Sequence, residues 1–233
     1  QDNQVRYLLS RGINKETQSY FKLVNIDGNI GIPYYEDNKI VGIKIKNIKK
    51  ENPKYFSITG SEFGLYNKQN IKDTSILIIT EGELDCNIIY QCGYSNVTSV
   101  GTGANSLDKL FEQERKFFNS FDSIILLSDN DDAGQNMDKA FIEEFGYKIK
   151  LPNKDLYKDC KDMNEVFLKH GQGQIKKIVN SAAVKIEGLR DLDIRPYEGV
   201  EAIEGSYIPT GLPSIDFAIN DLAPGLLTLV TGR

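Results

Sequence analysis

Two short apolar runs that end directly in acidic residues constrain the fold of this chain more than any other feature. The run "SILIIT" leads into Glu81, and the run "SIILLS" leads into Asp129. A run of four to eight apolar residues without polar alternation is typical of a strand that is buried on both faces. Both acids are therefore predicted to stand where a buried strand ends.

Strands and helices alternate from Ser75 to Gly171. The predicted strands contain the runs "SILIIT", "NVTSV", "SIILLSD" and "YKIKLP". Each is followed by a segment of helical period: "EGELDCNIIYQCG", "SLDKLFEQERKFFNSF", "DDAGQNMDKAFIEEFG" and "DMNEVFLKHG". This alternation predicts an α/β fold, a Rossmann-like parallel sheet with helices on both faces.

The first 70 residues follow a different pattern. The segment "GNIGIPYYEDNKIVGIKIKNI" predicts two strands around the turn "EDNK", and hence a smaller α+β subdomain with a hairpin. We assign residues 1–72 to this subdomain and residues 73–171 to the parallel-sheet domain. Residues 172–205 are predicted to form a linker, although their first part, "QGQIKKIVNSAAVKI", is also compatible with a helix.

Composition narrows the class of protein. A hydrophobic content of 40% is sufficient for a packed core, and no apolar run approaches the roughly 20 residues of a membrane helix. We therefore expect a cytoplasmic protein without a membrane partner. The three cysteines show no C-x-x-C spacing and His170 is the single histidine, so we expect neither a structural zinc site nor a disulfide framework.

Positive charge is concentrated in one segment, although the formal net charge of −5 argues against a nucleic-acid partner. Between residues 39 and 54, Glu51 is the single acid among six lysines: Lys39, Lys44, Lys46, Lys49, Lys50 and Lys54. These lysines are compatible with the solvated face of a hairpin. The neighbouring Tyr55 and Phe56 favour contacts with phosphates or bases.

Four acids are predicted to converge at one edge of the parallel sheet, because loops at the carboxyl ends of its strands meet there: Glu81, Asp129, Asp131 and Asp162. Carboxylates so close together need a compensating cation, and oxygen ligands favour Mg²⁺ or Mn²⁺. The i, i+2 spacing lets Asp129 and Asp131 face one ion. Asp85 is compatible with either a ligand role or a place in a helix first turn, and Asp132 favours the latter.

The segments "EGELD", "SDNDDAG" and "CKDMNE" resemble, in this order, the motifs of the TOPRIM fold of primases, topoisomerases and some nucleases. The upstream "NPKYFSITGSEFGLYNK" is similar to the segment that precedes TOPRIM in bacterial-type primases. The end of the chain, "YIPTGLPSIDFAINDLAPGLLTLVTGR", resembles the entry of RecA-like replicative helicases. The whole resembles the primase part of a bifunctional phage-type primase-helicase, with residues 206–233 as the start of the helicase domain.

The resemblance implies a catalytic and metal-binding role for Glu81, Asp129 and Asp131, with Asp162 as a further ligand. Asp85 is added to the predicted metal site because it starts the helix beside Glu81. The resemblance also implies that Lys46, Lys54 and Lys68 contact nucleotides or DNA, and we predict the same role for Lys161. Lys46 stands where primases often carry arginine, and a lysine lacks the bidentate fork. The G-K-[ST] of a phosphate-binding loop does not follow "LVTGR", so we expect a fragment of a longer protein without helicase ATPase activity.

The implied activity is metal-dependent synthesis of short RNA primers from ribonucleoside triphosphates on a single-stranded DNA template. The implied partner is the helicase domain of the same protein. Two alternatives stay open: a TOPRIM nuclease or topoisomerase, and a non-catalytic TOPRIM module that binds DNA or assembles a helicase ring. A topoisomerase needs a nucleophilic tyrosine on another domain, and none of the tyrosines here has a recognisable setting.

Overall fold

The structure is a computed structural model that describes residues 3–49, 53–61, 63–101 and 107–184. The described residues belong to one compact unit, Gln1–Glu187. Residues 185–205 of the predicted linker and the predicted helicase start, 206–233, lie outside the described ranges. No helix within these ranges is long and apolar enough to cross a membrane.

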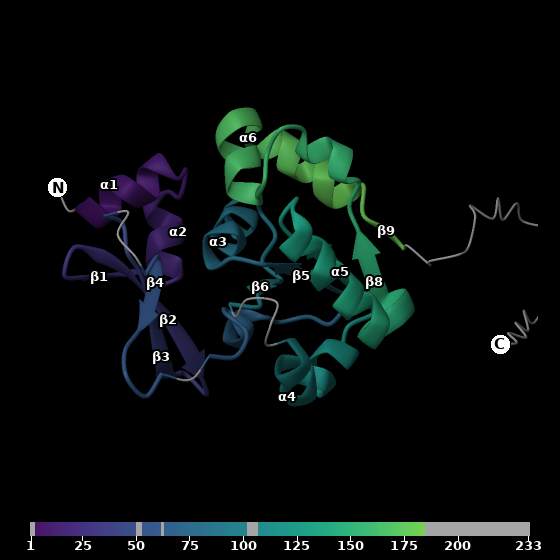
Figure 1. Cartoon of the computed structure of the whole chain (residues 1–233), viewed down its shortest axis with the longest axis horizontal. Helices are drawn as coiled ribbons and strands as arrows, with labels where there is room; N and C mark the ends of the chain where they lie inside the picture. The colour runs from purple at the N-terminus through teal and green to yellow at the C-terminus, as the bar shows by residue number, and fades with distance from the viewer. Residues whose placement is uncertain (1–2, 50–52, 62, 102–106, 185–233) are drawn as a thin grey trace, which may run out of the picture. The chain divides into compact units, whose positions relative to one another are not determined.

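A four-stranded antiparallel sheet forms the first part of the unit, in the order β1-β2-β3-β4 (Figure 1). Its strands are β1 (Val24–Ile26), β2 (Asn29–Glu36), β3 (Lys39–Lys46) and β4 (Tyr55–Ser57), and two helices precede it, α1 (Asn3–Ser10) and α2 (Lys15–Tyr20). Asp37 and Asn38, between β2 and β3, both have positive φ. Two such residues favour the tight hairpin turn that matches strand twist, so the predicted hairpin is confirmed.

A five-stranded sheet of order β6-β5-β7-β8-β9 forms the second part (Figure 1). Its strands are β5 (Ile76–Thr80), β6 (Val97–Ser99), β7 (Ser123–Leu127), β8 (Ile149–Leu151) and β9 (Ala183–Val184). The first four strands pair in parallel, which confirms the predicted α/β fold, and β9 pairs antiparallel with β8. Neighbouring helices are α3 (Glu83–Gln91), α4 (Leu107–Asn119), α5 (Asp132–Phe145) and α6 (Met163–Asn180), with short 3₁₀ turns η1 (Lys68–Asn70), η3 (Gly146–Lys148) and η4 (Lys154–Tyr157).

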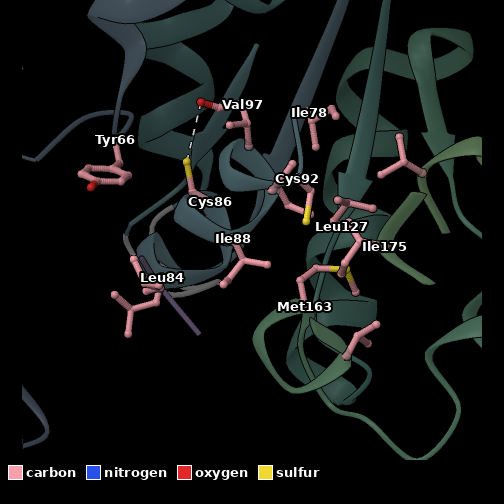
Figure 2. Packing of buried hydrophobic residues seen from close by; sticks show 14 of the residues in the cluster. Tyr66, Ile78, Leu84, Cys86, Ile88, Cys92, Val97, Leu127, Met163 and Ile175 are labelled. Carbon is pink, nitrogen blue, oxygen red and sulfur yellow. Dashed lines mark hydrogen bonds between the residues drawn. The ribbon is translucent and has the colours of Figure 1, made fainter. Parts of the chain in front are cut away.

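The central strands separate two apolar cores, because successive side chains point to opposite faces. In β5, Ile78 joins the core built with α3, α6 and the first sheet, while Leu77 and Ile79 join the core built with α4 and α5. Figure 2 shows the first core, in which Cys86 of α3 and Cys92, the residue that follows this helix, lie among aliphatic side chains. Burial on both faces explains why the strand carries no polar alternation.

Helix α6 crosses the predicted domain boundary after Gly171. That residue has φ +73° and interrupts the helical backbone, but a second helical segment continues to Asn180. Ile175 and Ile178 of this segment are fully buried in the first core. Residues 172–184 therefore pack with the parallel sheet, and the part of the predicted linker that the structure describes is a helix followed by β9.

Polar contacts join the first sheet to the second domain. Lys44 Nζ of β3 lies 2.6 Å from Glu83 Oε1 of α3 and donates a 2.6 Å hydrogen bond to the carbonyl of Gly101. Tyr34 of β2 donates a 2.5 Å hydrogen bond to the same oxygen of Glu83. Glu83 is buried, so these two donors satisfy a charge that would otherwise be costly.

Candidate metal-binding and nucleic-acid-binding site

The predicted acids gather at the carboxyl edge of the central strands. Glu81 directly follows β5, and Asp129 and Asp131 follow β7, its parallel neighbour. Asp85 lies in the first turn of α3, and Asp162 is the N-cap of α6. Asp129 lies close enough to Glu81 and Asp162 for their charges to raise its pKa. The charges of Asp162 and Asp129 likewise raise the pKa of Asp85, so these acids lie in one region.

Burial and mutual repulsion raise the pKa of three of these carboxyl groups. Desolvation raises the pKa of Asp129 to about 6, and the charges of Glu81 and Asp162 add to it. Desolvation also raises the pKa of Glu81, with Asp131 as the next cause, and that of Asp85, with Asp162 as the next. A site of this kind holds its ionised form at a cost that a bound cation offsets.

Lys161 lies against the Asp129–Asp131 pair. Its ammonium nitrogen is 2.8 Å from Asp131 Oδ2 and 3.4 Å from Asp129 Oδ2, so both carboxylates face one positive charge. The hydrogen bond from Lys161 lowers the pKa of Asp131. The Gly134 backbone N–H, which donates to Asp131 Oδ1 over 3.0 Å, lowers it further. The i, i+2 spacing thus aims both acids at a shared cation, while Asp131 also caps α5.

The donor chemistry of the acids fits a hard divalent cation. All five side chains offer carboxylate oxygens, and Oε2 of Glu81 is buried without a hydrogen-bond partner among the described residues. Across the described ranges, the side chains whose ligand atoms lie within 4.8 Å of one another are Asp159, Cys160 and His170. No three of the five acids come this close together in the described part of the chain, and the Lys161 ammonium contacts two of them.

Asp162 connects the acids to the amino-terminal helices. Its Oδ1 accepts a 2.7 Å hydrogen bond from the Glu165 backbone N–H, and its Oδ2 lies 4.0 Å from Nη2 of Arg11. The next residue but one, Asn164, donates from its backbone to Asp85 (2.8 Å) and from its side chain to the carbonyl of Arg11 (2.5 Å). The start of α6 is thereby tied to both α3 and the residue that follows α1.

Basic residues of the first sheet surround the ring of Tyr55. The ammonium nitrogens of Lys44, Lys46 and Lys54 lie 4.8, 4.4 and 5.7 Å from its centroid, within cation–π range. Lys46 also donates a 2.8 Å hydrogen bond to the Tyr55 hydroxyl. Desolvation lowers the pKa of Lys46 to about 8, and the charges of Lys54 and Arg11 add to this effect. We call Arg11, Lys46 and Lys54 the basic cluster.

Lys68 lies in a different setting from the basic cluster. It lines a groove of about 1050 Å³ between the β2–β3 turn and α4, and its Nζ is 2.5 Å from Glu114 Oε2. Phe117 of α4 lies under the same ammonium, 5.2 Å from ring centroid to Nζ. The expected nucleotide contact of Lys68 stays a prediction, and it requires this ion pair to open.

Sequence reasoning missed three residues that organise the site. Lys154 donates 2.7 Å hydrogen bonds to the carbonyl and the hydroxyl of Ser128, where β7 ends, and Lys44 and Arg11 contact Glu83 and Asp162. Arg11 and Lys154 lie outside the segments that signal the fold, and Lys44 was one of six indistinguishable lysines. The role of each of the three depends on a contact with a residue far along the chain, so no local sequence pattern identifies them.

The parallel sheet, its helices on both faces and the acids at its carboxyl edge define a TOPRIM fold of the primase type. Residues 78–167 match the family described as Toprim-like. The chain is 31% identical to the DNA helicase/primase of Enterobacteria phage T3, over 76% of this chain and 32% of that protein. It is 25% identical to the Twinkle homolog protein, chloroplastic/mitochondrial, of Arabidopsis thaliana, over 97% of this chain and 35% of that protein.

A solved structure supports the same class. The primase fragment of the bacteriophage T7 primase-helicase protein superposes with a TM-score of 0.63 and 27% identity, covering 73% of this chain and 72% of that one. The chain spans about a third of the length of the two curated relatives named above.

Proposed function

We propose that this chain is the primase part of a primase-helicase and makes short RNA primers on single-stranded DNA. The observation that carries the proposal is the pairing of a carboxylate-only site at the ends of β5 and β7 with the basic cluster near Asp85 and Asp162. Likeness to the helicase/primase of phage T3 and to the T7 primase fragment supports this reading of the site.

The acids are proposed to hold Mg²⁺ or Mn²⁺. Glu81, Asp129 and Asp131 provide the principal oxygens, and Asp85 and Asp162 complete the negative surface around them. When bound, such a cation lowers the pKa of an attacking 3′-hydroxyl and neutralises charge on a ribonucleoside triphosphate. Lys154 keeps the backbone after β7 in place through Ser128, and so fixes the direction of the Asp129 side chain.

The basic cluster is proposed to hold phosphates of the template or of the incoming nucleotide. Lys46 and Lys54 flank the ring of Tyr55, which holds the two ammonium groups close together. Arg11 lies beside Asp162 and offers the planar fork that Lys46 lacks. These positive charges counter the acidic edge, which by itself repels a nucleic acid.

Lys161 is proposed to act as an internal counter-ion. Its ammonium holds Asp129 and Asp131 together, and it moves to a phosphate oxygen when a divalent cation occupies the pair. The same ion pair favours a second candidate function, a non-catalytic TOPRIM module that binds DNA or assembles a helicase. In that case the lysine stays in place as a permanent structural partner of both acids.

A primer-synthesis assay decides between these two functions. It measures incorporation of labelled ribonucleotides on single-stranded DNA with Mg²⁺ or Mn²⁺, for the chain, Asp131→Asn and the control Asp132→Asn. Asp132 lies next to the site but is exposed and starts α5. Metal-dependent products that vanish in Asp131→Asn and persist in Asp132→Asn support the primase. DNA binding without products, on varied templates and also when the additional domains of a relative are fused to the chain, supports the non-catalytic module.

The partners follow from the same proposal. The chain would bind single-stranded DNA and ribonucleoside triphosphates, and it would work beside a helicase domain of the same protein. Residues 206–233, which resemble the entry to such a domain, lie outside the described ranges.

A further inference from the structure

A second cluster of ligand-type side chains lies apart from the acids that follow β5 and β7. The ligand atoms of Asp159, Cys160 and His170 lie within 4.8 Å of one another. Asp159 and Cys160 belong to the segment between η4 and α6, and His170 lies on α6. The cluster combines one oxygen, one sulfur and one nitrogen donor, which distinguishes it chemically from the carboxylate-only edge.

The distances in this cluster are close to the edges of a tetrahedral metal site. His170 Nε2 is 3.7 Å from Asp159 Oδ1, and Cys160 Sγ is 3.9 Å from the same oxygen. Metal–ligand bonds of about 2.0–2.3 Å at tetrahedral angles give ligand separations of roughly 3.3–3.8 Å. The two distances to Asp159 Oδ1 thus match this range to within a few tenths of an ångström, and the third pair, Cys160 and His170, lies within 4.8 Å.

Two of the three ligands are prepared for such a role. Among the residues that the structure describes, His170 Nε2 is buried without a hydrogen-bond partner, and it lies 3.7 Å from Asp159 Oδ1. Cys160 is buried at 2% exposure, and its backbone N–H is held by the carbonyl of Tyr157 over 3.1 Å. A buried polar atom without a partner is rare in folded proteins and calls for an explanation.

The third ligand is oriented by its neighbour on α6. Lys169 Nζ lies 3.1 Å from Asp159 Oδ2 and accordingly leaves Oδ1 facing the sulfur and the imidazole. A carboxylate that binds a metal is commonly hydrogen-bonded in turn, and the Lys169 ammonium provides such a hydrogen bond here. Lys169 thus fixes the exposed Asp159 without blocking the atom that faces the cluster.

We propose that Asp159, Cys160 and His170 bind one divalent cation of the Zn²⁺ class, with the fourth position open to water. Thiolate and imidazole donors select Zn²⁺ or Co²⁺ over Mg²⁺. The cysteine spacing did not predict this site, since nine residues separate Cys160 from the only histidine and the segment before α6 must fold back on the helix. The inference does not depend on the proposed primase activity.

Binding at this site would tie the segment before α6 to the second turn of that helix. Lys161, which contacts Asp129 and Asp131, directly follows Cys160, and Asp162 follows Lys161. The proposed ion would therefore stiffen the segment that carries both residues to the acidic edge.

The test is a titration of the untagged 233-residue chain, kept reduced, with Co²⁺ in the presence of excess Mg²⁺. We expect one Co²⁺ per chain and a near-ultraviolet thiolate-to-metal charge-transfer band that Zn²⁺ abolishes. Cys160→Ser should remove the band, and Asp159→Asn and His170→Gln should each weaken binding at least roughly tenfold. Asp155→Asn, an exposed acid of η4, serves as the matched control.

Three outcomes would overturn the proposal. The first is no one-to-one binding at micromolar Co²⁺. The second is Co²⁺ binding that gives no thiolate band and that is lost in Asp129→Asn, because this result would locate the ion at the acids. The third is a band that survives Cys160→Ser, which would assign it to Cys86 or Cys92. Circular dichroism of each variant checks folding, and His170→Gln, altered at a partly exposed position, keeps the test valid if Cys160→Ser does not fold.

Discussion

At the scale of single residues, the site holds its charges at a cost to stability. Asp129 is 17% exposed in its side chain, and its pKa is raised to about 6 by burial and by its acidic neighbours. The folded state therefore binds this proton more tightly than the unfolded state does. The contribution of Asp129 to the free energy of unfolding falls as the pH rises from about 4 to about 6, and it stays unfavourable at pH 7.

Asp129→Asn is expected to stabilise the chain in the absence of divalent cations. Removing the ionised carboxylate should raise the free energy of unfolding by about 1–3 kcal/mol at pH 7, and by less at pH 4.5, where the wild-type group is largely protonated when folded. Urea unfolding with a chelator at both pH values measures this difference. The exposed Asp132→Asn should change stability by less than about 0.5 kcal/mol. A destabilised Asp129→Asn would contradict the raised pKa.

The charge of Lys46 is expected to make DNA binding depend on pH. Its pKa of about 8 means that the ammonium is present at pH 7 and lost by pH 9. If Lys46 contacts a phosphate, affinity for single-stranded DNA should fall about three- to fivefold over this range. This factor corresponds to the loss of one contact that contributes roughly 1 kcal/mol or less. Fluorescence anisotropy at constant ionic strength measures the change.

Lys46→Arg is the matched control for this pH dependence. Arginine keeps its charge at pH 9, so this variant should lose much less affinity between pH 7 and pH 9. Equal losses in the two proteins would show that Lys46 does not contact the DNA.

At the scale of elements, the turn from β7 into α5 leaves no room for a side chain at Gly134. A Cβ there would overlap the carbonyl oxygen of Asp129, and the Gly134 backbone N–H caps Asp131. The helix start and the two acids are therefore packed as one unit.

Gly134→Ala is expected to lower the free energy of unfolding by about 1–3 kcal/mol, the usual cost of overpacking, and to displace the two acids. Gly173→Ala in α6, where a Cβ meets nothing within 4 Å, should be neutral or stabilising by up to about 1 kcal/mol. Urea unfolding and the primer-synthesis assay measure both effects. Full activity in Gly134→Ala would show that the turn relaxes without moving the acids.

At the scale of the whole described unit, one buried acid joins the two sheets. Glu83 is 2% exposed and receives contacts from Lys44 and Tyr34 of the hairpin. A Cβ on Gly101, whose carbonyl also accepts from Lys44, would overlap the Tyr34 hydroxyl. Close backbone approach and a compensated charge thus hold the basic hairpin beside the acidic domain.

Lys44→Met is expected to lower the free energy of unfolding by about 3 kcal/mol, because it leaves the Glu83 carboxylate buried without its cation. The double variant Lys44→Met/Glu83→Gln should recover at least half of this loss, since the amide carries no charge. Urea unfolding of both variants completes the comparison. A cost below about 0.5 kcal/mol for Lys44→Met would mean that the ion pair does not form in solution.

Local patterns determined the elements and the main acids. The apolar runs predicted β5 and β7 because strands covered on both faces need no polar positions, and the "EDNK" turn predicted the hairpin between β2 and β3. Glu81, Asp129 and Asp131 were predictable because the carboxyl ends of parallel strands share an edge. The continuation of α6 beyond Gly171 was not, since a glycine that ends a helix and one that interrupts it look alike in sequence.

Tertiary structure alone decided which charges meet. Arg11 reaches Asp162, Lys44 reaches Glu83, and Lys161 lies between Asp129 and Asp131, whereas Lys68 pairs with Glu114 in a separate groove. The parallel sheet and the acids at its edge were predictable from the sequence, because they follow from periodicities of a few residues. The basic partners and the Asp159–Cys160–His170 cluster depend on segments that fold back on one another. No local periodicity encodes which of these distant segments come together.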